Sequence, residues 1–61
     1  MFTTDNTEGQ FTTNELATLN AAAAIITARN PDMLEYSVKD AITNAWIGDQ
    51  TAEELADATG F

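Results

Sequence analysis

The sequence contains no cysteine and no histidine, and only two of its 61 residues are basic. Without thiols and imidazoles the chain can form no disulfide, and it lacks the side chains that proteins use most often for catalysis and metal binding. Its ten acidic residues give a net charge of -8, which repels the phosphates of a nucleic acid. We therefore expect no enzymatic activity, no cofactor, no metal ion and no direct contact with nucleic acid.

Long apolar runs are also missing. No segment is long enough to span a bilayer, and the polar, acidic first ten residues lack the basic start and apolar run of a secretion signal. We expect a cytoplasmic protein without membrane contact. Because Phe2 is the only large apolar residue after Met1 in this stretch, residues 1–10 are predicted to be a flexible polar tail, and residues 11–61 a single helical domain.

Three times in the chain, a Ser or Thr is followed three positions later by an acid that opens an apolar stretch, which is the pattern of a helix capping box. The pairs are Thr12 with Glu15, Ser37 with Asp40, and Thr51 with Glu54. Stop signals follow at Asn30-Pro31, Gly48 and Gly60. These signals predict an all-α fold, a small bundle of three principal helices at residues 13–29, 38–47 and 52–59.

Apolar periodicity identifies a candidate core. Its members are Phe11, Leu16, Leu19, Ile26, Val38, Ile42, Trp46 and Leu55. Trp46 is expected inside the bundle, with a role as an interface anchor as the alternative. Met33, Leu34 and Tyr36, between the first two helices, are expected to cover the core, and an exposed docking patch is the alternative.

The acid excess has two interpretations. Several acids stand in first helical turns, where the helix dipole stabilises negative charge by about 0.3 to 1 kcal/mol, so capping and solubility explain part of the excess. The other interpretation is docking on a basic partner, or imitation of nucleic-acid phosphates. The densest local group comprises Asp49, Glu53, Glu54 and Asp57, and we predict it to be the partner-binding surface.

The first predicted helix is apolar on two sides. Leu16, Leu19, Ala23 and Ile26 form one stripe, and an opposite stripe consists of Ala17, Ala21, Ala24 and Ala28, with Ile25 at its border. In one interpretation the other two helices cover both sides within a monomer. In the alternative, the alanine stripe meets a second copy or a partner, since self-association is the stabilising device still open to a small chain without disulfides.

Residues 51–61 contain a Thr cap, then Glu-Leu-Ala, then a glycine and an apolar residue. This pattern resembles the first helix and turn of a bacterial helix-turn-helix, in which a recognition helix would follow and enter the major groove. The sequence stops at Phe61 without that helix, so the resemblance implies a truncated or relic regulator and carries over no DNA-contacting residue.

In general character the chain is also similar to the small acidic proteins that phages use against host enzymes, including anti-restriction and anti-CRISPR inhibitors. Our leading hypothesis is therefore a non-enzymatic protein-binding module that inhibits a basic or nucleic-acid-handling host protein. The alternatives are a self-associating structural module that dimerises through the alanine stripe, and the relic regulator.

Overall fold

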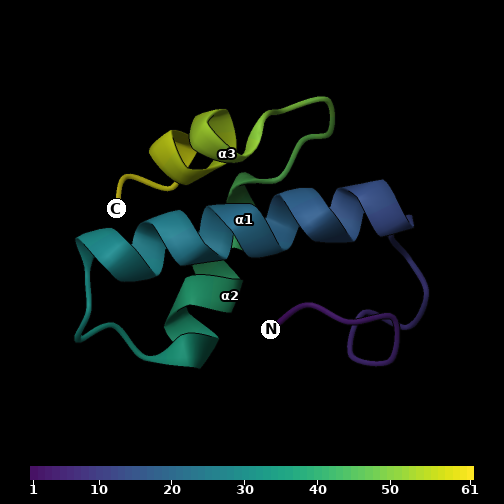
Figure 1. Cartoon of the computed structure of the whole chain (residues 1–61), viewed down its shortest axis with the longest axis horizontal. Coiled ribbons are helices and arrows are strands. Elements are labelled where there is room, and N and C mark those ends of the chain that lie inside the picture. The colour runs from purple at the N-terminus through teal and green to yellow at the C-terminus, as the bar shows by residue number, and fades with distance from the viewer.

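The computed structural model describes residues 1–61 and consists of three α-helices without a strand (Figure 1). The helices are α1 (Thr13–Arg29), α2 (Glu35–Ala45) and α3 (Ala52–Ala58). The long α1 is central: α3 lies along one side of it, α2 crosses behind it, and α2 and α3 also contact each other (Figure 1). The predicted all-α bundle is confirmed.

α1 begins and ends where its local signals predict. The Thr12 hydroxyl accepts a hydrogen bond from the Glu15 N–H (3.1 Å), and Glu15 Oε1 accepts one from the Thr12 N–H (2.8 Å). At the other end, the Asn30 N–H donates to the Ile26 carbonyl before Pro31 stops the helix. A capping side chain of this kind contributes about 1 kcal/mol, so local chemistry suffices to define this helix.

α3 also follows its prediction. Thr51 and Glu54 form the expected reciprocal capping box, with distances of 2.9 and 3.1 Å. The helix ends at Ala58, one residue earlier than predicted. Gly60 has a φ of 82°, the left-handed conformation expected of a glycine stop signal.

The start of α2 corrects the prediction. α2 begins at Glu35 rather than at residue 38, and Leu34 caps it without a side-chain hydrogen bond. Ser37 therefore lies inside the helix, and the predicted Ser37–Asp40 capping box is wrong. The chain turns at once after Pro31, where the Met33 N–H donates to the Asn30 carbonyl (3.0 Å), so the helix can begin three residues sooner.

The end of α2 also differs, because the helix stops at Ala45 rather than at Ile47. Trp46 adopts an extended conformation (φ −68°, ψ 124°), and the Gln50 side chain takes the place of a further helical turn. Its Nε2 donates to the Ala45 carbonyl (3.1 Å), and its Oε1 accepts from the Ile47 N–H (3.0 Å). The helix therefore ends at a contact between Ala45 and Gln50, which are five residues apart. Capping rules that consider single residues do not predict such a contact.

The core lies where the three helices meet. Five predicted members, Leu19, Ile26, Val38, Ile42 and Leu55, are fully buried, whereas the predicted Phe11, Leu16 and Trp46 are only partly buried. The prediction missed Phe2, Ala22, Ala23 and Ala56. Ala23 lies on the predicted apolar stripe with Leu19 and Ile26, whereas Ala22 and Ala56 are buried by close helix packing, which small side chains permit without a periodic signal of their own.

Residues 1–10 are not the loose tail that their composition predicts. Phe2 is only 6% exposed and belongs to the core. Asn20 of α1 holds its backbone from both sides: Oδ1 accepts from the Phe2 N–H (2.7 Å) and Nδ2 donates to the Phe2 carbonyl (2.9 Å). The radius of gyration is 10.5 Å, which matches the roughly 10.5 Å of a compact 61-residue domain, so this segment is packed onto the helices.

Candidate functional site

The acidic residues predicted to bind a partner divide into two pairs. Glu54 is the reciprocal member of the α3 capping box, and Asp57 accepts a hydrogen bond from Arg29 (2.9 Å), whose guanidinium also donates to the Phe61 carbonyl (3.1 Å). Both carboxylates therefore have structural roles within the chain. The side chains of Asp49, in the loop before α3, and Glu53, in the first turn of α3, in contrast have no hydrogen bond or ion pair.

The acid excess remains mostly unpaired in the folded chain. Three of the ten acidic side chains, Glu15, Glu54 and Asp57, have an intramolecular partner, which leaves seven without one. Four acids stand in first helical turns, namely Glu15, Glu35, Glu53 and Glu54, and Asp40 is not among them because α2 begins at Glu35. The unpaired carboxylates are free to meet an external cation.

The loop between α2 and α3 holds a large aliphatic side chain in water. Ile47 is 85% exposed, the most exposed large hydrophobic residue of the chain. Gly48 and Asp49, which follow it, have positive φ angles of 90° and 56°, and Gln50 ties the loop back to the end of α2. Ile47 was not predicted to be exposed, because the sequence signals placed it inside the second helix, which ends at Ala45.

An aromatic pair lies beside this loop. Trp46 packs edge-on against Phe11, with 6.0 Å between ring centroids and 79° between ring planes. Both rings are partly buried, so Trp46 is neither fully in the core nor a free anchor. Trp46 also lines a small hollow, about 200 Å³ in volume, together with Glu15, Asp49 and Gln50. Asp49, whose side chain has no partner, thus lines the same hollow as Trp46.

The alanine stripe of α1 is not covered by the other helices. Its four alanines, Ala17, Ala21, Ala24 and Ala28, are exposed, and Ile25 at the border is half-buried. The interpretation that α2 and α3 enclose both sides of α1 is therefore wrong: they bury the side that carries Leu19 and Ile26. A shallow hollow of about 490 Å³ runs beside the stripe, with Met1 at its edge.

The connector between α1 and α2 corrects a further expectation. Met33 packs against the core as predicted, but Leu34 and Tyr36 are 58% and 66% exposed and cover nothing. The reason is the early start of α2, which places both residues in or before the first helical turn. The alternative, a docking patch, stays a prediction for these two side chains.

The structure contains no group of three or more acidic residues placed to bind a metal ion. None of its three helices has the combination of length and hydropathy that crossing a bilayer requires.

No protein-family model matches the chain, and no curated protein or solved structure matches it either. The resemblance of residues 51–61 to a helix-turn-helix and the general similarity to phage anti-host proteins therefore stay predictions. The function is therefore inferred from the exposed side chains and hollows of the molecule itself.

Proposed function

We propose that this protein is a non-enzymatic binding module that docks on a partner protein with a basic surface. The partner class we favour is a nucleic-acid-handling host protein, because such proteins have basic grooves that a chain with a net charge of -8 complements. In this proposal the module acts as an inhibitor of the phage type and works in the cytoplasm.

The observation that supports the proposal is that the exposed Ile47 is followed in the chain by two acids without an internal partner. Ile47 is 85% exposed, and the two acids nearest along the chain that have no internal partner are Asp49 and Glu53. Unpaired surface charge accelerates the encounter with an oppositely charged partner, and burial of an apolar side chain slows dissociation. One short segment thus provides both components of a protein interface.

The predicted partner-binding acids would have unequal roles in such a complex. Asp49 and Glu53 have no side-chain partner within the chain, so their main role would be toward the partner, and Glu53 also stands in the first turn of α3. Glu54 and Asp57 would add negative charge, but their replacement also removes a helix cap and the Arg29 ion pair. A clean test therefore changes the first two residues and leaves the other two intact.

The test compares two double variants with the same change in charge. A partner captured from a lysate of the source organism is purified, and its affinity is measured by calorimetry at several salt concentrations. Asp49→Asn with Glu53→Gln should weaken binding about tenfold and reduce its salt dependence. Asn tolerates the positive φ of Asp49, so the loop should keep its shape.

The matched control is Asp32→Asn with Glu35→Gln. These acids lie in the connector between α1 and α2 and at the start of α2, at the other end of α1 from the Ile47 loop (Figure 1). The control should change affinity less than about twofold, because surface charges far from a contact are screened. Equal losses in the two double variants would show that net charge, and not this surface, determines binding.

Self-association is a second candidate function, and the exposure of the alanine stripe favours it. Ala17, Ala21, Ala24 and Ala28 follow one another along the outside of α1, and small side chains let a second helix approach closely. Between Glu15 and Arg29 this helix has no charged residue, so two copies could meet there without placing charges in direct contact.

Light scattering tests this second candidate. A dimer should dissociate on dilution, and Ala21→Gln with Ala24→Gln should convert it to a monomer, because longer polar side chains prevent close approach. Ala58→Gln, the same change at an exposed alanine of α3, should leave the mass unchanged. A monomeric wild-type mass at micromolar concentration would reject the candidate.

A further inference from the structure

We propose that the hollow between the N-terminal segment and α2 receives an arginine side chain of the partner. This inference deepens the function proposed above and rests on it, since it names the chemical group by which a basic partner would be recognised. One wall of this hollow comes from residues 2–10, which were predicted to be a flexible tail without a site, and from Phe11, which was predicted to belong to the core.

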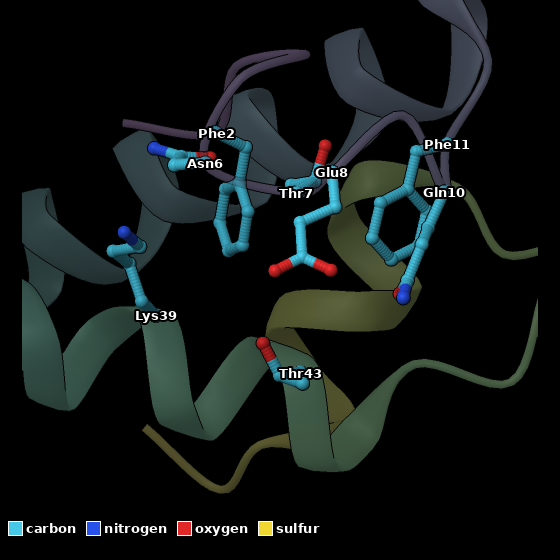
Figure 2. Close-up of a pocket in the computed structure, with 8 residues that line it drawn as sticks. All are labelled: Phe2, Asn6, Thr7, Glu8, Gln10, Phe11, Lys39 and Thr43. Carbon is cyan, nitrogen blue, oxygen red and sulfur yellow. The ribbon is translucent and has the colours of Figure 1, made fainter.

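The hollow is formed by segments far apart in the chain. Phe2, Glu8 and Phe11 line it from the N-terminal segment, and Lys39 and Thr43 line it from α2 (Figure 2). Its volume is about 320 Å³, at the lower end of the range for small-molecule sites, which suits a single side chain. Because Asn20 ties Phe2 to α1, the segment that forms one wall is fixed in place.

The carboxylate of Glu8 gives the hollow its preference for a cation. It has no hydrogen bond or ion pair within the chain, and Figure 2 shows it directed between the rings of Phe2 and Phe11, toward the Thr43 hydroxyl. An anion bordered by aromatic rings attracts a positive group through both charge and the ring faces. Thr43 adds a hydroxyl oxygen that can accept a further N–H bond.

Lys39 places one cation beside the Phe2 ring. Its ammonium lies 5.9 Å from the centroid of the Phe2 ring, and in Figure 2 it is on the other side of that ring from the Glu8 carboxylate. The lysine does not neutralise Glu8, because no ion pair joins them. The hollow is therefore lined by one carboxylate and one ammonium that are not paired with each other, and an arginine would enter on the Glu8 side.

Arginine fits these features better than lysine. A guanidinium is flat, so it can lie against an aromatic ring, and it can donate two parallel hydrogen bonds to one carboxylate. A lysine ammonium is strongly hydrated and acts as a point charge, so it gains less from the ring walls.

The hollow is also well placed relative to the proposed interface. Phe11, which lines it, packs against Trp46, which lines the second hollow with Asp49. The aromatic pair therefore lies between two hollows that each hold an unpaired carboxylate. A single basic partner could reach both.

A titration without the partner tests the inference. Isotope-labelled protein in low salt is titrated with N-acetyl-arginine-N-methylamide and followed by NMR. Saturable shifts should appear at the amides of Glu8, Phe11 and Thr43, with a dissociation constant of about 1 to 10 mM, as expected for so small a ligand. The citrulline analogue, which is neutral but similar in shape, should produce none, and the lysine analogue should bind about fivefold more weakly.

Three variants sharpen the test. Glu8→Gln should weaken arginine binding about tenfold, whereas Asp5→Asn, the same loss of charge outside the hollow, should change it less than about twofold. Lys39→Met should strengthen it about twofold, because a like charge is removed. The spectrum of each variant reports whether the fold is kept.

The inference is overturned if the shifts do not saturate, if they lie elsewhere on the protein, or if Glu8→Gln and Asp5→Asn have the same effect. Such a result would leave the proposed function standing, since that depends on the partner's response to Asp49→Asn with Glu53→Gln. The opposite result is also distinguishable. If arginine binds in the hollow but Asp49→Asn with Glu53→Gln leaves the partner affinity unchanged, the proposed Asp49 and Glu53 surface is rejected and the arginine site is kept.

Discussion

Two of the non-helical segments, residues 1–12 and residues 46–51, are anchored in the same way, but the first buries a large apolar side chain and the second exposes one. In each, one amide side chain holds the backbone through two hydrogen bonds: Asn20 binds both sides of Phe2, and Gln50 binds Ala45 and Ile47. The first anchor keeps the aromatic side chain of Phe2 in the core. The second keeps the aliphatic side chain of Ile47 in solvent, where it is 85% exposed.

Because of this difference, we expect the Phe2 anchor to affect the stability of the fold and the Ile47 anchor to affect partner binding. Phe2 loses its contact with water on folding, so its anchor should contribute to the free energy of unfolding. Ile47 gains almost nothing from folding, so its anchor should matter mainly for what the protein binds. Three substitutions test this contrast through the free energy of unfolding, and they are ordered from the largest expected loss to the smallest.

Asn20→Ala should have the largest effect. It removes both hydrogen bonds to Phe2 and releases the segment that completes the core, so we expect the free energy of unfolding to fall by about 2 to 3 kcal/mol. For a domain of this size that is a large share of the total. Urea unfolding provides the measurement. Asn44→Ala, at an exposed asparagine of α2 without a side-chain hydrogen bond, should cost far less, and equal losses would contradict the anchoring role of Asn20.

Gln50→Ala should have an intermediate effect. The Ala45 carbonyl at the end of α2 loses its donor and the Ile47 N–H loses its acceptor, but both groups can bind water instead, so the expected loss is about 1 kcal/mol. Partner affinity should fall as well, because Ile47 is no longer held in one position. Calorimetry on the purified partner checks this second part. If affinity stayed constant while stability fell, the loop would have a structural role only.

Ile47→Ser should have almost no effect on stability. The side chain is in solvent in the folded chain, so the free energy of unfolding should change by less than about 0.5 kcal/mol, whereas affinity for the partner should drop about tenfold. Ile42→Ser is the buried counterpart and should cost several kcal/mol in the same unfolding experiment. A clear loss of stability in Ile47→Ser would mean that the loop packs more closely than the structure indicates.

Local signals predicted the fold well wherever one residue satisfies the backbone of its near neighbours. The boxes of Thr12 with Glu15 and of Thr51 with Glu54 set the first residues of α1 and α3 as expected, since both partners lie within one helical turn. α2 was less well predicted. Its start depends on the turn at Pro31, and its end depends on Gln50, which the signals at Ser37 and Gly48 do not reveal.

The candidate site was only partly visible in the sequence. Asp49, Glu53, Glu54 and Asp57 were proposed together because acids gather there in the sequence, but the sequence could not show that Glu54 and Asp57 are engaged within the chain. Ile47 and Glu8 were missed altogether. Their importance arises from exposure and from the lining of a hollow, and neither property has a pattern along a single segment.

The sequence by itself determined the charge, the lack of reactive side chains, the helical class and two of the three helix starts, because these depend on composition or on contacts within one turn. Only the tertiary structure decided that Phe2 is buried, that Ile47 is exposed, that the alanine stripe stays uncovered and that Glu8 faces a hollow across from α2. The reason is physical: burial and the pairing of charges depend on which distant segments meet, and contacts such as that of Asn20 with Phe2 join residues 18 positions apart.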